Sequence, residues 1–320
     1  MPKRLTLILD STVCVRYGLE QAGAERGYNP KKPGRPSHHP LLAFIQQTSD
    51  CLGVRWRPGN AHTAAGAEAW LTDLVGRLRV AGVEQITVRL DKGFFSRSIV
   101  GTLQSLDVDF LLKIPAHPWL QDHQAPWRRS AKGENIFPGH ELWITSGTLW
   151  HARLLSIQTR RPLQGENILE LDTYEVPLSA HVLTNIEGIH AITAWRCYNQ
   201  GAVIEQRIEE LGQLALGHTA VGDLESNALL WGLGVFAYQI LHTLRSTALS
   251  GSWRRAQPKR LRLWILRLPA KFTGHARKTY LQLLKDEPAR QTLLGALRKL
   301  TQGLPPPLPA GACPPLRYRT

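Results

Sequence analysis

Two aspartates each follow an apolar run that is typical of a buried strand. Leu5-Thr6-Leu7-Ile8-Leu9 ends at Asp10, and Ile86-Thr87-Val88-Arg89-Leu90 ends at Asp91. Short runs of this kind predict strands at the centre of an α/β sheet. Because burying a charge is costly, an acid fits only where such a strand ends, at the rim of a cleft. The two carboxylates could therefore converge on one point, although each aspartate alone could also be an ordinary turn residue.

A third acid, Glu205, lies on a segment with helical spacing of apolar residues, which are Val203, Ile204, Ile208 and Leu211. Taken alone, Glu205 is best interpreted as an exposed helix acid beside Glu209. Three acids from two strands and a helix are nevertheless the oxygen ligands that hard divalent cations such as Mg²⁺ need. Two such ions can hold the attacking and leaving oxygens of a phosphoryl displacement, and no serine or cysteine nucleophile is then required.

The elements that would position these acids alternate between strand and helix. After the first strand, Val13 to Tyr17 is predicted to form a hairpin with it, and a long Gly- and Pro-rich loop follows up to Pro40. An amphipathic helix over residues 67–78 precedes the strand that ends at Asp91. A short helix from Ser96 to Leu106 and a strand from Phe110 to Ile114 come next. This alternation predicts an α/β fold.

The pattern changes after residue 114. Residues 115–192 contain short β-like runs separated by Gly, Pro and Asn, which predicts a β-rich insertion. Helical spacing returns near Asn199 and continues to about Arg245. Basic helices are predicted beyond a linker, followed by a Pro-rich tail. Their predicted limits are Leu261–Leu268, His275–Leu284 and Ala289–Leu300.

The net charge of +14 is concentrated at one end of the chain. Residues 251–320 carry 15 of the 39 Lys and Arg residues, but only two of the 25 acids, Asp286 and Glu287. A basic segment on a nearly neutral body indicates contact with a polyanion such as nucleic acid. A merely solvated basic face is the alternative.

The composition also excludes several classes of protein. An apolar content of 43% argues against disorder throughout. The four cysteines form no CxxC pair, which argues against a zinc site and fits a reducing compartment. The N-terminus has no signal-peptide pattern, and the most apolar long stretch, residues 228–244, is short for a membrane span. We therefore expect a cytoplasmic protein with no membrane partner.

Several motifs, weak one by one, together make the chain resemble the DDE transposases of bacterial insertion sequences, of the Tyr-Arg-Glu-Lys type. The resemblance covers nearly the whole chain. Its motifs are Leu9-Asp10-Ser11-Thr12, the Gly27 to Leu41 loop, Arg57-Pro58-Gly59-Asn60, Arg89-Leu90-Asp91-Lys92-Gly93-Phe94-Phe95, Tyr198-Asn199-Gln200 with Glu205, Leu261-Arg262-Leu263 and His275-Ala276-Arg277.

The resemblance implies a ribonuclease H-like mixed sheet flanked by helices, with the β-rich insertion between Asp91 and Glu205. It implies a basic helical C-terminus. The catalytic domain would comprise residues 1–114 and 193–249, the insertion 115–192, the basic helical region 250–303 and the tail 304–320.

The resemblance also implies chemistry and partners. Asp10, Asp91 and Glu205 would be the catalytic triad and would hold two Mg²⁺ ions, with Mn²⁺ as a substitute. The partners would be double-stranded DNA, at the element's ends and in the target, and a second copy of the chain on that DNA, at the bacterial nucleoid. The expected DNA-binding residues are Lys92, Tyr198, Arg207, Arg254, Arg255, Lys259, Arg260 and Arg262.

Two departures from the family pattern keep alternatives open. The motif around the catalytic Glu has an Arg and a Lys where this chain has Gly201 and Gly212, and only nine residues precede Asp10. Arg207 cannot simply replace the missing Arg, because six residues along a helix turn it to a different face. An inactive DNA-binding remnant of a truncated transposase is one alternative. A metal-dependent nuclease without strand transfer is the other.

Overall fold

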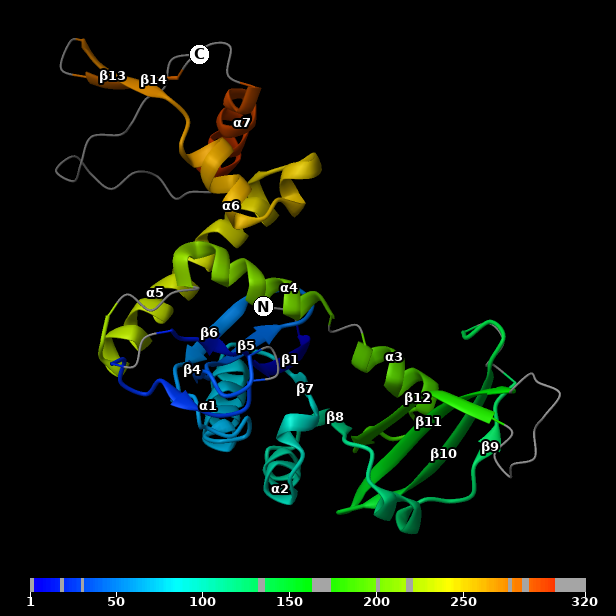
Figure 1. Cartoon of the computed structure of the whole chain (residues 1–320). Coiled ribbons are helices and arrows are strands. Elements are labelled where there is room, and N and C mark those ends of the chain that lie inside the picture. The colour runs from blue at the N-terminus through cyan, green and yellow to red at the C-terminus, as the bar shows by residue number, and fades with distance from the viewer. Residues whose placement is uncertain are drawn as a thin grey trace. The chain divides into compact units, whose positions relative to one another are not determined.

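The computed structural model forms two compact units, drawn in Figure 1. The first comprises Met1–Arg207 and Ala220–Ala228, and the second comprises Ile208–Thr219 and Leu229–Thr320. The domain limits drawn from the sequence stay a prediction. The structure describes residues 3–17, 20–29, 32–131, 136–162, 174–199, 202–216, 221–275, 278–283 and 288–302.

Five strands at one end of a mixed sheet position the two aspartates. They lie in the order β6-β5-β1-β7-β8. β1 runs parallel to β7, and β7 runs parallel to β8. β5 runs antiparallel to both of its neighbours, β1 and β6. Because β1 and β7 are parallel neighbours, their C-terminal ends meet at the same edge. The bounds of the five are β1 Arg4–Ser11, β5 Leu41–Ile45, β6 Cys51–Arg55, β7 Gln85–Leu90 and β8 Asp109–Ile114.

The β-rich stretch extends this same sheet. β12 pairs with β8 in antiparallel register, with His181 opposite Ile114, and the order β8-β12-β11-β10-β9 completes nine strands. The prediction of a mixed α/β fold with β structure between Asp91 and Glu205 is thus confirmed. These strands are β9 Arg128–Arg129, β10 Glu141–Leu149, β11 Ala152–Pro162 and β12 Tyr174–Thr184.

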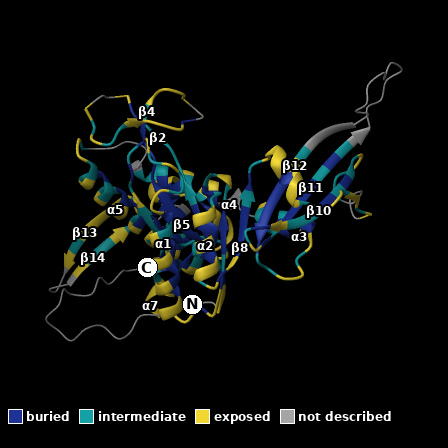
Figure 2. Ribbon diagram, turned by 90° about the horizontal axis from the view of Figure 1, so that it is seen from below, coloured by how far each residue is buried: buried dark blue, intermediate teal, exposed yellow. Residues whose placement is uncertain are grey.

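Helices bury the apolar side chains of the sheet. α1 (Ala67–Val80) and α2 (Arg97–Ser105) pack in a cluster with the face of β1 that carries Leu5, Leu7 and Leu9. α3 (Ala191–Asn199) packs in a second cluster with β10 and β11. Figure 2 shows both sets of strands largely buried. Successive side chains of a strand point to opposite faces of the sheet. Since Leu5, Leu7 and Leu9 face α1 and α2, Asp10 lies on the other face.

The predicted hairpin between Val13–Tyr17 and the first strand is wrong. β2 (Cys14–Val15) pairs with β4 (Pro36–His38) in a small separate sheet with β3 (Glu25–Arg26). The antiparallel partner of β1 is β5, in which all five side chains are buried. An entirely apolar strand gains more from the buried position than the Cys-Val-Arg-Tyr segment does, because that segment carries a charge and a hydroxyl.

Gly59 lies where the small sheet leaves no room for a side chain. A Cβ there would lie 1.9 Å from the Ser37 carbonyl oxygen and 2.4 Å from that of Glu25, both in the backbone of the sheet. We expect Gly59→Ala to lower the free energy of unfolding by about 2 kcal/mol, measured by urea denaturation. Gly76→Ala is the matched control. Its Cβ would meet nothing within 4 Å in α1, so it should stabilise by about 0.5–1 kcal/mol. Equal effects of both changes would contradict the steric argument.

The second unit mixes helices with a β-hairpin. Its apolar cluster contains Leu249, Leu261, Ile265 and Ala296. The helix predicted over His275–Leu284 is wrong, because β13 and β14 form an antiparallel hairpin with Phe272 opposite Leu281. The other two predicted helices overlap observed helical turns and α7, and the predicted tail 304–320 lies outside the described residues. The elements are α4 Ala202–Leu211 and α5 Leu224–Thr243, both shared with the first unit, then α6 Pro258–Leu261, β13 Ala270–His275, β14 Lys278–Leu283 and α7 Pro288–Gln302.

α5 is the most apolar long helix of the chain. Asp223 caps its start, since the carboxylate accepts a hydrogen bond from the Ser226 amide at 2.7 Å. Among the described residues, no helix combines the length and the apolar character needed to span a bilayer.

Candidate active site

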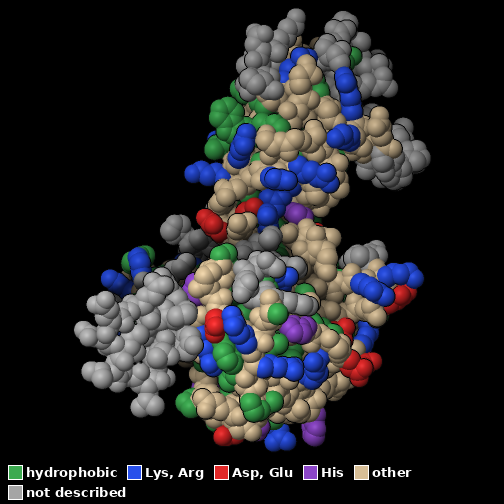
Figure 3. Space-filling model, turned by 90° about the vertical axis from the view of Figure 1, so that its right-hand side faces the viewer, with side chains coloured by type: hydrophobic (Ala, Val, Ile, Leu, Met, Phe, Trp, Pro, Cys, Tyr) green, Lys and Arg blue, Asp and Glu red, His purple; other side chains and the backbone are tan. Residues whose placement is uncertain are grey.

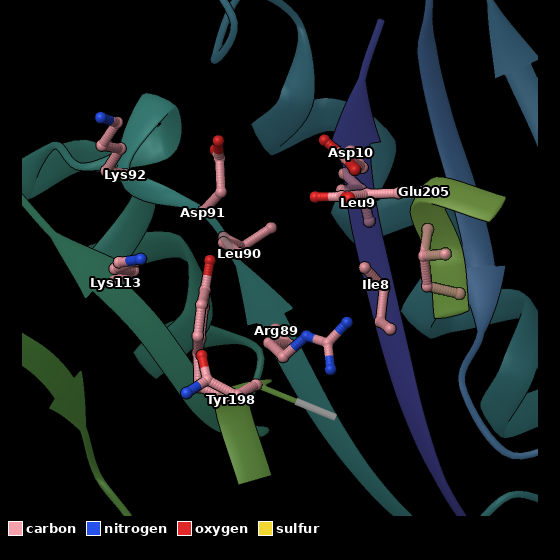
Figure 4. A pocket seen from close by; sticks show the side chains of 12 residues that line it. Ile8, Leu9, Asp10, Arg89, Leu90, Asp91, Lys92, Lys113, Tyr198 and Glu205 are labelled. Atoms are coloured by element: carbon pink, nitrogen blue, oxygen red, sulfur yellow. The ribbon is translucent and has the colours of Figure 1, made fainter. Parts of the chain in front are cut away.

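A pocket of about 350 Å³ opens in the first unit at the C-terminal ends of β1 and β7. All three acids singled out from the sequence line it, and Figure 4 shows them with their neighbours. The lining residues are Ile8, Leu9, Asp10, Arg89, Leu90, Asp91, Lys92, Lys113, Tyr198, Asn199, Ile204 and Glu205. The structure therefore brings the three acids together from the ends of β1 and β7 and from α4, although Asp10 and Glu205 are more than 100 residues apart in the sequence.

The strand register explains why Asp10 and Asp91 line the same pocket. Ile8 lies opposite Arg89 across the parallel β1–β7 pair. Each aspartate follows two residues further along its strand, so the two carboxylates leave the sheet at the same level. Parallel neighbouring strands place the residues at their carboxyl ends along one edge, where α/β proteins generally bind ligands.

Local hydrogen bonds fix both carboxylates. Asp10 Oδ1 accepts from the Ser11 amide at 2.8 Å. Asp91 Oδ1 accepts from the Gly93 amide at 2.9 Å and caps the 3₁₀ turn Lys92–Phe94. The alternative of a turn residue is therefore correct for one oxygen of Asp91, but it does not exclude a role for the same carboxylate in the pocket. Gly93 is needed there because a Cβ would lie 2.9 Å from Thr63 Cγ2.

Glu205 reaches the pocket from α4. Its neighbour Ile204 is buried and lines the same pocket, which anchors this turn of the helix, while Glu205 itself is exposed. Figure 4 shows the carboxylates of Asp10, Asp91 and Glu205 around one opening. Both Asp91 and Glu205 are near enough to raise the pKa of Asp10.

The charges in the pocket perturb one another. Burial, the Asp91 carboxylate and, to a smaller extent, Glu205 raise the pKa of Asp10 to about 7 from its ordinary 3.8. Burial also raises the pKa of Asp91, against the opposing effects of the Gly93 amide, Lys92 and Lys113. Burial is therefore the main reason why both aspartates hold a proton more tightly than usual, and the neighbouring carboxylates add to it at Asp10.

Tyr198 separates two cations at the base of the pocket. The Arg89 guanidinium lies 5.8 Å and the Lys113 ammonium 5.3 Å from the centroid of its ring. Arg89 is buried and donates to Gln46 Oε1 at 3.0 Å. Burial is the main cause that raises the pKa of Tyr198, so its hydroxyl stays protonated at neutral pH.

The predicted DNA-binding residues divide into two groups. Lys92 and Tyr198 line the pocket, whereas Arg207 is half-buried on α4 and does not line it. The other predicted residues are exposed on the second unit, where Figure 3 shows several Lys and Arg side chains at the surface. These are Arg254, Arg255, Lys259, Arg260 and Arg262.

Among the polar lining residues, Arg89 and Asn199 lie in the sequence motifs without a predicted role, and Lys113 lies outside every motif. Lys113 interrupts an otherwise apolar strand, Phe110-Leu111-Leu112-Lys113-Ile114, and that interruption is the signal that could have identified it. A charge inside a buried strand needs a specific reason. Asn199 follows Tyr198 at the end of α3 and carries no comparable signal.

The lining acids fit a divalent cation by their chemistry. Among the described residues, no group of three His, Cys, Asp or Glu side chains is arranged to hold a metal ion as it stands. The donors are all carboxylate oxygens, which Mg²⁺ prefers. Burial and, after it, the Asp91 and Glu205 carboxylates raise the pKa of Asp10, so a positive charge here would stabilise its ionised form. Asp10, Asp91 and Glu205 are therefore the residues that would hold such ions.

We expect Asp10→Asn to stabilise the metal-free protein at high pH. Because the pKa of Asp10 is about 7 in the folded protein and 3.8 ordinarily, the folded state binds this proton more tightly. Stability is therefore lost as the pH rises from about 4 to about 7. In EDTA at pH 8, Asp10→Asn should raise the free energy of unfolding by about 2–3 kcal/mol, and the gain should shrink toward pH 5.

Urea denaturation at pH 5 and pH 8 checks this expectation. Asp73→Asn is the control, since Asp73 is an exposed acid on α1 paired with Arg77 at 3.6 Å. If Asp10→Asn raises the free energy of unfolding by the same amount at both pH values, the gain does not come from the charge of Asp10.

Comparison with known proteins gives one broad match. A family model described as Transposase DDE domain group 1 matches residues 1–304. No curated protein matches the chain. Among solved structures, the chain is similar to a piggyBac transposase in a synaptic complex with hairpin DNA, determined by cryo-electron microscopy, with 14% identity and a TM-score of 0.41. That match covers 74% of this chain and 46% of the other, so the chain spans less than half of that transposase.

Proposed function

Because the chain belongs to the group 1 family of DDE transposase domains, we propose that it cuts and joins DNA by metal-dependent phosphoryl transfer. It would hydrolyse a phosphodiester at the end of a mobile element, and the freed 3′-hydroxyl would then attack target DNA. The observation that carries the proposal is the pocket lined by Asp10, Asp91 and Glu205.

We further propose that the sheet is ribonuclease H-like. The order β6-β5-β1-β7-β8, in which β1, β7 and β8 are parallel and β5 is antiparallel to both β1 and β6, supports this. In that arrangement the central strand carries the first catalytic acid and its parallel neighbour the second, as β1 and β7 do with Asp10 and Asp91.

The proposed cofactors are two Mg²⁺ ions, or Mn²⁺, held by the three acids. When bound, such ions lower the pKa of water and neutralise charge on the phosphodiester. The protein's own groups would prepare the site. Asp10 and Asp91 are held by the Ser11 and Gly93 amides, so their free oxygens are already oriented. Lys92, beside Asp91, would attract the DNA backbone to the opening.

Double-stranded DNA would also contact the second unit. Five exposed cations, Arg254, Arg255, Lys259, Arg260 and Arg262, lie within nine residues there, with Arg260 stacked 4.6 Å from the centroid of the Trp253 ring. Such side chains bind phosphates without regard to sequence. As two ends must be brought together, we propose that two copies of the chain act on DNA as a homodimer.

One sequence feature favours a second candidate function. Gly201 and Gly212 stand where the Tyr-Arg-Glu-Lys pattern has Arg and Lys. A chain without those cations could be an inactive DNA-binding remnant, which would bind DNA in a salt-sensitive way but would not cut it.

A nicking and joining assay tests the proposed function. The substrate is a supercoiled plasmid carrying the DNA that flanks the gene on both sides, with Mg²⁺, with Mn²⁺ or with EDTA. We expect nicks and joined products only with metal. Nicks without joined products would indicate a nuclease, and salt-sensitive binding without nicks would indicate the remnant.

A further inference from the structure

Lys113 is a cation placed inside the candidate active site by the sheet itself. Its neighbours Leu112 and Ile114 are buried in the cluster with α1 and α2, so the pleat turns Lys113 to the other face, toward Tyr198 and the pocket. Arg89 lies opposite Leu111 in the parallel β7–β8 pair. Two residues further along each strand, Lys113 on β8 is therefore level with Asp91, in the same way as Asp91 is level with Asp10.

The ammonium of Lys113 is available to a ligand. Among the described residues, no acid forms an ion pair with it and none forms a hydrogen bond to it. Its Nζ atom lies over the Tyr198 ring, 5.3 Å from the ring centroid. A cation over an aromatic face is held in place but keeps its N–H donors. Arg89, on the other side of the ring, differs because it donates to Gln46 and is buried.

An anionic substrate needs such a group. A phosphodiester that approaches Asp10, Asp91 and Glu205 meets three carboxylates in a partly buried pocket. Lysine binds phosphate as a point charge and suits a site without a fixed fork of donors. The chain has glycine at both positions where the Tyr-Arg-Glu-Lys pattern would supply cations. Lys113 is a cation that already lines the pocket with the acids, from the strand next to β7.

Resting on the proposed function, we infer that Lys113 binds the DNA phosphodiester at the reacting position beside Asp91. It is a substrate-binding residue supplied by β8, outside every sequence motif of the site.

Two measurements test this role. The first compares nicking by Lys113→Met, which keeps the apolar stem but removes the charge, with Lys113→Arg and Lys3→Met. Lys3 is the matched control, because it lies just before the start of β1, at the opposite end from Asp10, and pairs with Glu84 at 2.8 Å. We expect Lys113→Met to slow nicking about 100-fold at saturating DNA, Lys113→Arg to stay within about 5-fold, and Lys3→Met to match wild type.

The second measurement does not depend on activity. Wild-type protein is treated with a water-soluble acetylating reagent, with and without a short duplex of the flanking DNA and Mg²⁺, and each lysine is quantified by peptide mass spectrometry. We expect the duplex to slow acetylation of Lys113 about 10-fold and to leave Lys3 unchanged.

The outcomes separate the two proposals. Nicking by Lys113→Met at the wild-type rate, or acetylation of Lys113 that DNA does not slow, would overturn the inference even if the wild type cuts DNA. If the wild type fails to cut, the proposed function fails, and protection of Lys113 alone decides whether a phosphate binds there.

Discussion

Replacing Asp91 by alanine is expected to lower metal-dependent nicking by about 10³-fold or more while the protein remains folded. Asp91 ends β7 level with Asp10 and lines the pocket with Glu205. Its removal takes away one of three oxygen donors for the proposed ions. It also takes one negative charge out of the pocket, so the two remaining acids would attract a cation less strongly.

The measurement is the plasmid assay with Mg²⁺, compared with wild type and with Asp73→Ala on the exposed face of α1. Asp91→Asn separates chemistry from folding, because an amide oxygen can still accept from the Gly93 amide that Asp91 now caps. We expect Asp91→Asn to be as inactive as Asp91→Ala and to unfold at a temperature no lower than that of wild type, because burial raises the pKa of Asp91. Equal nicking by wild type and Asp91→Ala would refute the assignment of the three acids.

Replacing Glu210 by alanine is expected to lower the free energy of unfolding of the second unit by about 3–5 kcal/mol. Arg245 Nη2 donates to Glu210 Oε2 at 2.8 Å, and the two side chains are only 4% and 5% exposed. Arg245 Nη1 also donates to the Ala256 carbonyl at 3.1 Å, and its guanidinium lies 5.9 Å from the centroid of the Tyr238 ring. Removing the acid leaves a buried guanidinium without its counter-charge, which costs far more than losing an exposed pair.

Urea denaturation of three variants measures this effect. Glu209→Ala changes the adjacent, exposed acid of α4 and should cost less than about 0.5 kcal/mol. Glu210→Met combined with Arg245→Met removes both charges and should recover most of the loss, because a buried pair often contributes little net stability over apolar replacements. If Glu210→Ala is as stable as Glu209→Ala, the pair does not hold this unit together.

Local patterns were enough to predict the ends of β1 and β7. Each strand owes its existence to a run of apolar residues next to one another, and an acid at the end of such a run has to lie at an edge. The cap at Asp223 is local in the same way, since the capping side chain and the amide it binds are three residues apart. Features set within one turn or one strand can be read without knowing what they pack against.

The hairpin β13–β14 shows where that reading fails. Phe272 and Leu281 are nine residues apart and face each other only after the strands pair. The apolar residues of His275–Leu284 have helical spacing, but the partner with which this segment pairs, β13, lies mostly before it in the sequence. The same kind of error assigned the wrong partner to β1, which pairs with Leu41–Ile45 across a long loop.

The residues alone indicate that two buried strands end in carboxylates and that excess positive charge gathers in the last 70 residues. The fold was needed to show that Lys113 and Tyr198 share a pocket with those carboxylates and that Glu210 pairs with Arg245, 35 residues away. This is because strand order and helix docking are set by the burial of many apolar side chains at once. The position of one polar side chain relative to another is a consequence of that packing, which no short stretch of residues specifies.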